Sequence, residues 1–409
     1  MLHPWFKEYI LLALRIDKLF KKSGDHFIDA YIGPDELSEI VVKENYKSIG
    51  NLMKSASRLI QALPKQNFEN QRYEFLEKQV QAMEMTLRIL NKEKISFNKQ
   101  VEQCLDIELK WVPEEYFKQG IELYKQGLPG KGDIFNRFDN WNKRNIYSFK
   151  NRNEKMIIIN SVIDEIRKRT KKVVDLPVEE KVILKMISNK KFGAATWYLG
   201  NYSSLMQINE DIPLNVFNLL PVISHELYPG HHTEFCMKEM EYSHAIDYTE
   251  HQIAILISPR LVISEGIGEI AFDIIFEPED AARWMQENIY KRLDIKTDDV
   301  NLACLIKAAR TNSLDQIYGN AAILLNDGCS EEQVKKYMKE YTLQSDEVLY
   351  RVITNLKESV FKRIYSLSYF NGKNIIKNLL SKQEKQYEYF EQLLIEHVYP
   401  SLLIKRHHD

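Results

Sequence analysis

The segment at residues 219–239, LLPVISHELYPGHHTEFCMKE, constrains the fold of this chain more than any other feature. It places three histidines and three acids in a mostly apolar context of helical periodicity, which Pro229-Gly230 interrupts. Zinc hydrolases use two neutral imidazoles to hold the ion and a carboxylate beside the first imidazole to accept a proton from water. His225 and Glu226 match that pair, so the segment predicts a helical element that carries a metal site.

The second histidine ligand is not fixed by spacing alone. A regular helix presents two ligand histidines on one face at a spacing of four residues, about 400° of turn, but that position is Pro229. Proline removes a helical N–H and clashes with the carbonyl four residues back, so we expect a kink or a π-bulge here. Such a bulge would bring His231 to the ligand position. His232 is the alternative, because seven residues return to the same face, about 10.5 Å further along the helix.

A third ligand is expected in the segment at residues 261–272, LVISEGIGEIAF. Glu265 and Glu269 lie four residues apart, on one face of an otherwise apolar helix. Two like charges there are costly unless a cation or hydrogen-bond donors face them. Catalytic zinc keeps three protein ligands and one open position. We therefore predict one Zn²⁺ ion, with Glu265 as the third ligand and Glu269 as the partner of a ligand imidazole.

The pattern H-E-x-x-P-G-H-H resembles the signature of a bacterial family known as domain-of-unknown-function family 885. Four further segments resemble that family's markers, at residues 29–34, 128–132, 197–202 and 369–372. The resemblance runs from about residue 28 to 373 and implies a mainly helical metallopeptidase-like fold, similar to angiotensin-converting enzyme and the thermostable carboxypeptidases. In those relatives a Glu-Gly/Ala-x-Gly-acid segment supplies the third ligand, which corresponds to Glu265, with Glu269 as the outer acid.

Composition agrees with a mainly α fold, because only 15 glycines and 12 prolines interrupt 409 residues, and the resemblance implies a deep central cleft within it. Residues 47–95 predict two helices, the second with a continuous apolar stripe. Residues 202–209 alternate with a period near two, which predicts a strand of a small antiparallel sheet or hairpin near the metal site. In zinc peptidases an edge strand in that place binds the substrate backbone.

We expect two parts within one cleft-bearing unit. Residues 1–185 would form a helical N-terminal part and one wall of the cleft, and residues 186–409 would form the catalytic part. The boundary follows the segment at residues 175–180, whose proline and acids predict the restart of a helix.

The net charge of −2 gives no reason to expect nucleic acid or an anionic membrane surface, and no apolar stretch approaches the roughly 20 residues of a membrane span. The first 22 residues predict an amphipathic helix and show no export signal. Four widely separated cysteines are typical of free thiols in a reducing compartment. They are Cys104, Cys236, Cys304 and Cys329. These features together predict a cytoplasmic location.

Acyl transfer at zinc requires a donor to the oxyanion, and tyrosine commonly serves. Tyr365 and Tyr369 lie four residues apart and can face one cleft, and the family resemblance favours Tyr369. The sequence therefore predicts a zinc-dependent peptidase of the carboxypeptidase, dipeptidase or oligopeptidase type, with Glu226 as general base and a short peptide or small amide as substrate.

Two other interpretations stay open. One is a zinc hydrolase of the same architecture that acts on a non-peptide amide or an ester. The other is a non-catalytic helical binding or structural protein. Structural zinc sites are closed and usually rich in cysteine, so the isolated cysteines and Glu226 argue against the last interpretation.

Overall fold

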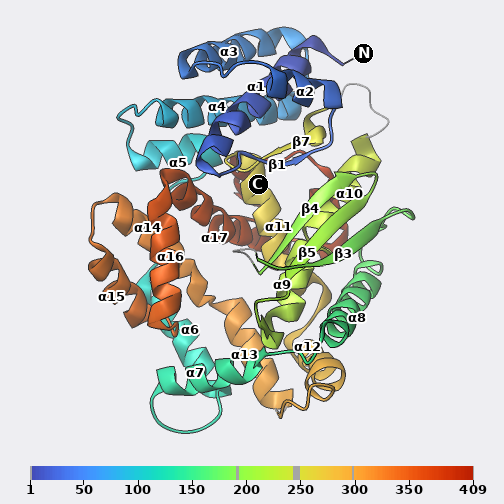
Figure 1. Ribbon diagram of the computed structural model, residues 1–409, viewed down its shortest axis with the longest axis vertical. Coiled ribbons are helices and arrows are strands. Elements are labelled where there is room, and N and C mark those ends of the chain that lie inside the picture. The colour runs from blue at the N-terminus through green and yellow to red at the C-terminus, as the bar shows by residue number, and fades with distance from the viewer. Residues whose placement is uncertain (1, 190–192, 243–248, 297–298, 409) are drawn as a thin grey trace.

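The computed structural model of the protein describes residues 2–189, 193–242, 249–296 and 299–408. Helices dominate this part of the chain and the sheets are small, which confirms the mainly α fold (Figure 1). The N-terminal helices form one end of the molecule, at the top of Figure 1. They are α1 (Pro4–Phe20), α2 (Asp35–Lys43), α3 (Ile49–Ala62), α4 (Asn70–Leu90) and α5 (Phe97–Leu105).

The predicted helix pair at residues 47–95 is confirmed as α3 and α4. The apolar stripe of α4 is buried at Leu76, Val80, Met83 and Leu87, as helical spacing predicts. These side chains belong to a core that also includes Val262 of α11 (Pro259–Ile275) and residues of α17 (Val360–Ser381), so the N-terminal helices pack directly on the central ones.

The opposite end of the molecule is also helical and has its own apolar core. Its helices are α6 (Glu114–Gly127), α7 (Ile134–Asn145), α8 (Arg152–Thr170), α12 (Pro278–Met285), α13 (Asp299–Thr311), α14 (Ile317–Asn326), α15 (Glu331–Tyr341) and α16 (Asp346–Glu358). The central and C-terminal helices are α9 (Leu219–Glu226), α10 (His231–Tyr242), α11 (Pro259–Ile275), α17 (Val360–Ser381), α18 (Gln386–Ile395) and α19 (Pro400–His408).

A three-stranded sheet lies beside α10, in the order β3 (Lys181–Ile187), β5 (Ser203–Asn209), β4 (Ala194–Gly200). β4 and β5 form the predicted antiparallel hairpin, and β3 adds in parallel to β5. The alternating segment is therefore the central strand β5, and the edge beside the site is β4. Residues 175–180 lead into β3 and do not restart a helix, since β-branched and apolar residues follow them directly.

Two strand pairs complete the sheets of the described residues. β1 (Ile28–Tyr31) pairs with β7 (Ile253–Ile255), and β2 (Ile146–Tyr147) pairs with β6 (Leu214–Asn215), both antiparallel. The first pair joins the N-terminal helices to the start of α11. Residue 185 lies within β3, and the division of the chain into two parts stays a prediction.

Two glycines set how closely α11 and α17 cross. A β-carbon on Gly266 would lie 2.5 Å from the Gly372 backbone, and one on Gly372 would lie 2.1 Å from the Val262 carbonyl oxygen. No side chain fits in that space, so the two helices meet backbone to backbone. This crossing places the acids of α11 beside the tyrosines of α17.

Candidate metal centre

The Pro-Gly interruption divides the histidine-rich segment into two helices. α9 ends before it and α10 begins after it, and the Tyr228–Pro229 peptide bond is cis. The amide of Gly230 donates to the Ser224 carbonyl at 3.0 Å, six residues back, so the chain loops out and returns to the end of α9. A β-carbon on Gly230 would lie 1.8 Å from the carbonyl oxygen of His225, so only glycine fits this approach.

The expected kink or π-bulge is therefore a complete break between two helices. Pro229 has no amide to donate, and the loop continues until Gly230 can supply one. The break nevertheless brings His231 beside His225, as a bulge was expected to do. His231, the first residue of α10, lies beside His225, with the ring centroids 4.7 Å apart and the rings perpendicular.

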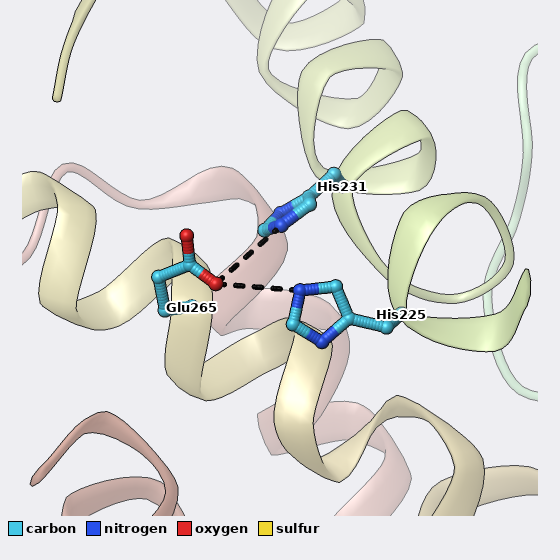
Figure 2. Close-up of side chains that lie close together, drawn as sticks. All are labelled: His225, His231 and Glu265. Carbon is cyan, nitrogen blue, oxygen red and sulfur yellow. Dashed lines mark ion pairs between the residues drawn. The ribbon is translucent and has the colours of Figure 1, made fainter. Parts of the chain in front are cut away.

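Three side chains converge on one point between α9, α10 and α11. They are His225, His231 and Glu265, and one ligand atom from each lies within 4.8 Å of the others (Figure 2). Nε2 of His225 is 3.3 Å from Oε2 of Glu265, and Nε2 of His231 is 3.8 Å from the same oxygen. A tetrahedral ion with bonds of roughly 2.1 Å separates its ligand atoms by roughly 3.4 Å. The distances from the two imidazoles to Glu265 are thus close to those of a zinc site, and the two imidazole nitrogens lie within 4.8 Å of each other.

The carboxylate of Glu265 is incompletely satisfied by the residues that the structure describes. Tyr365 donates to Oε1 at 2.6 Å, but the buried Oε2 accepts no well-aligned hydrogen bond and faces the two imidazoles. Burial opposes charge on His225, yet the adjacent Glu265 more than offsets this and raises the pKa of His225 to about 9. An unsatisfied buried carboxylate oxygen beside two ring nitrogens is the arrangement that a cation would complete.

Neighbouring side chains hold both imidazoles in place. A β-carbon on Gly268 would lie 2.7 Å from the ring of His225, so this ring rests directly on the backbone of α11. Ser264 donates its hydroxyl proton to Glu234, and its oxygen lies 3.3 Å from Nδ1 of His231. The hydroxyl can then only accept from Nδ1–H, which leaves Nε2 of His231 free to bind a metal.

His232 lies outside this cluster. It is 1% exposed; Nδ1 lies 2.7 Å from the Ser204 hydroxyl and Nε2 lies 3.3 Å from Glu180. Both ring nitrogens therefore have polar partners, and burial lowers the pKa of this imidazole. Of the two histidines that the sequence leaves open, the structure places His231 beside His225 and Glu265.

The other predicted residues surround the cluster. Glu226 is partly exposed and lines the same cavities as His225. Oε1 of Glu269 lies 3.8 Å from Nδ1 of His225, so charge and not a hydrogen bond links the two side chains. The hydroxyl of Tyr369 donates to that of Tyr365 at 3.2 Å. Burial and the nearby Glu265 raise the pKa of both tyrosines, so both stay protonated and able to donate.

The cluster lies between cavities of unequal size. A cavity of about 580 Å³ is lined by His225, Glu226, Glu269 and Tyr369 and extends toward α6, α7 and α16. A cavity of about 780 Å³ shares Glu269 and Tyr369 with it. A smaller cavity, about 240 Å³, is lined by the whole metal cluster and by β4. The three cavities share Tyr369 in their walls, and the deep central cleft stays a prediction.

Three neighbours of the cluster have no role in the sequence-based prediction. Tyr365 and Ser264 contact the ligands directly, and Asp29 lines the small cavity. The spacing of Tyr365 from Tyr369 indicated a shared face but not the contact with Glu265. The segment that contains Asp29 resembles a family marker, and that resemblance was the only signal for it.

No family model matches the chain, and no curated protein matches it in sequence. Solved structures match in fold. A predicted lipoprotein from Colwellia psychrerythraea superposes with a TM-score of 0.54 at 15% identity, over 88% of this chain and 69% of that one. A predicted lipoprotein of unknown function from Shewanella oneidensis gives a TM-score of 0.49 at 12% identity, over 91% and 72% of the two chains. The first similarity shows a shared fold, and the resemblance to family 885 stays a prediction.

The cytoplasmic location expected from the sequence is contradicted, because the Colwellia chain that shares this fold is described as a lipoprotein. The inference of a cytoplasmic protein is therefore withdrawn. Among the described helices, none is both long and apolar enough to cross a bilayer.

Proposed function

We propose that the protein is a zinc-dependent peptidase that hydrolyses short peptides. One observation carries the proposal: His225, His231 and the unsatisfied oxygen of Glu265 face one point in a cleft, next to the carboxylate of Glu226. This ligand set, two imidazoles and one carboxylate with an open side, is typical of catalytic and not of structural zinc. A zinc ion held there would activate water and polarise the scissile carbonyl.

The chain's own residues supply the remaining functions. Glu226 would accept the proton of the attacking water and pass it to the leaving nitrogen, so that water adds across the peptide bond and yields a carboxylate and an amine. Tyr369, which is protonated and lines each of the three cavities, would donate to the carbonyl oxygen as negative charge develops. The edge strand β4 would bind the substrate backbone.

Enclosure of the site supports short substrates. Cavities of about 580 and 240 Å³ meet at the cluster and are bounded by helices and by β4, so a folded protein would not reach the centre. A non-peptide amide would fit the same chemistry. The two cavities that extend from the metal point favour a chain-like substrate.

The test combines Glu226→Gln with metal analysis. Wild type and variant are both expected to bind about one zinc per chain by elemental analysis, since Glu226 is not a ligand. Hydrolysis of a pool of short peptides, followed by mass spectrometry, is expected to fall about 10²- to 10⁴-fold in the variant only.

Glu241→Gln is a matched control, because Glu241 is an exposed acid on the neighbouring helix α10. It is expected to leave both metal content and hydrolysis unchanged. Full activity in Glu226→Gln, or wild-type protein that binds no divalent metal, would contradict the proposal. Hydrolysis of esters with no hydrolysis of any peptide would favour the alternative substrate class.

A further inference from the structure

The small cavity of about 240 Å³ has a charge distribution that the metal centre does not explain. Among the described residues that line it, Asp29 on β1 is the only acid besides Glu226 and Glu265, and none of these lining residues is a lysine or an arginine. The remaining wall is apolar or uncharged. It includes Ala194, Ala195 and Leu261. An acidic group therefore faces a small, otherwise neutral space on the β4 side of the metal centre.

A β-bulge directs Asp29 into this cavity. Ile28 pairs with Ile255 and Ala30 pairs with Ala254, so Asp29 is the additional residue that has no partner on β7. Bulges change the direction of a side chain and are common beside active sites. In a strand without the bulge, Asp29 would pair with a residue of β7, and its side chain would alternate in direction with those of its neighbours.

The carboxylate of Asp29 has no hydrogen bond and no ion pair within 4.0 Å among the residues that the structure describes. Other acids near the site have partners: Glu234 pairs with Lys238 at 3.0 Å, and Asp273 pairs with Arg310 at 2.9 Å. The side chain of Asp29 is exposed in the wall of the cavity, and the loss of hydration among the surrounding groups raises its pKa to about 6, against the opposing effects of His231 and Arg260. It is therefore mostly ionised at neutral pH.

A second unsatisfied group lines the same space. Oγ1 of Thr196 on β4 is buried and has no hydrogen-bond partner among the described residues. A carboxylate without a partner that faces the cavity favours a cationic ligand, and one that carries hydrogen-bond donors. An alkylammonium group meets both requirements.

We propose that Asp29 binds the α-ammonium group of the substrate, so that the protein removes a short fragment from the free amino end of peptides. The inference rests on the proposed peptidase activity and selects its substrate class. The small cavity is below the roughly 300–1,000 Å³ typical of sites for drug-sized ligands, so it has room for only a short amino-terminal portion. The remainder of the peptide would occupy the larger cavities.

Paired substrates test this assignment. A short peptide and its N-acetylated form are compared on zinc-loaded wild type, Asp29→Asn and the control Asp164→Asn, which changes an exposed acid on α8. A hydrogen bond to a charged group contributes about 1.5–3 kcal/mol, so wild type and Asp164→Asn should prefer the free amine in kcat/KM by about 10- to 100-fold. Asp29→Asn should lose this preference and retain its rate on the acetylated peptide.

Binding separates this inference from the proposed function. Calorimetry with Glu226→Gln should show tighter binding of the free-amine peptide, and the double variant with Asp29→Asn should bind both peptides equally. This difference would uphold the role of Asp29 even if no peptide were hydrolysed.

Equal binding and equal rates on both peptides in protein with intact Asp29 would overturn the proposal. A preference that persists in Asp29→Asn would do the same. A third arm uses acetylated peptides with lysine or norleucine in the fragment. If discrimination follows lysine and not the terminal amine, the assignment to the α-ammonium group is wrong.

Discussion

His231 and His232 are adjacent in the chain and lie in opposite environments. His231 has a side-chain exposure of 21%, faces the cleft, and points Nε2 at a carboxylate oxygen that lacks a hydrogen bond. His232 is fully buried and has polar partners at both nitrogens. Successive residues at the start of a helix point about 100° apart, so one turns toward the cavity and the other toward the sheet.

The partners of His232 form a closed cluster. Glu180 accepts from Tyr228 and pairs with Arg167, and the hydroxyl of Ser204 on β5 completes the contacts of the ring. This cluster ties the Pro-Gly loop to the sheet and to α8. Its groups satisfy one another, so it has no capacity for a ligand.

The comparison shows that residue type does not distinguish a candidate metal site from a structural polar cluster. Both regions combine histidine, glutamate and tyrosine. The two regions differ in whether their polar atoms have hydrogen-bond partners. In the His231 region a buried carboxylate oxygen beside a cavity has no hydrogen bond. In the His232 region both ring nitrogens and the carboxylate have partners. A buried acceptor without a well-aligned hydrogen bond is costly, and this difference is what supports the proposed metal site beside His231.

The largest expected effect separates the two histidines directly. His231→Ala should lower zinc affinity by more than about 100-fold, because it removes a ligand. Loss of a residue that only hydrogen-bonds a ligand typically lowers metal affinity by about 10- to 100-fold. His232→Ala should change zinc affinity by less than tenfold but destabilise the fold by about 2–4 kcal/mol, since it leaves Glu180 and Ser204 without partners and opens a cavity. Chelator competition and urea unfolding measure the two quantities, and the reverse pattern would make His232 the ligand.

The second prediction concerns Glu234, which supports His231 through Ser264. Burial would raise its pKa, but Lys238 and Arg260 lower the pKa from 4.5 to about 2. A depressed folded-state pKa contributes stability above the unfolded value, and this contribution is lost as pH falls from 4.5 toward 2. Between pH 6 and pH 3 the loss should be about 2 kcal/mol.

Urea unfolding across that range measures the loss. Glu234→Gln should be less stable at pH 6, because it leaves Lys238 and Arg260 without their counter-charge. Its stability should also fall less steeply with acid than that of wild type. Parallel curves for the two proteins would show that Glu234 is not the source of the pH dependence.

The smallest expected effect concerns the outer support of Glu265. Tyr365→Phe removes the hydrogen bond to Oε1 and should weaken zinc binding by roughly tenfold, the lower end of the range for such partners. Tyr387→Phe is the control, because Tyr387 is 54% exposed. If Tyr365→Phe leaves zinc affinity unchanged, Glu265 holds its position without this support.

The sequence predicted those parts of the fold that depend on local patterns. The apolar stripe of α4 and the β4–β5 hairpin follow from spacing and alternation within short segments. The sequence did not show that β3 would join the sheet in parallel, because that pairing links segments about 20 residues apart. It also assigned the edge position to β5, since alternation marks a strand but not its place in a sheet.

The same limit applies to the candidate site. His225 was predicted as a metal ligand because Glu226 follows it directly, and Glu265 because it is an acid on an otherwise apolar helix. Glu269 was predicted because it shares a helical face with Glu265. Asp29 was not proposed as a site residue, since its direction depends on a bulge that exists only when β1 pairs with β7, more than 220 residues away.

The sequence by itself indicated the residues of the proposed metal site, because these residues and the proline that interrupts them are encoded within two short segments. Only the tertiary structure decided between His231 and His232 and placed Asp29 in the small cavity. The physical reason is that a side chain's partners come from other elements: α11 and Ser264 face one imidazole, β5 and Glu180 face the other, and sequence spacing describes neither set of contacts.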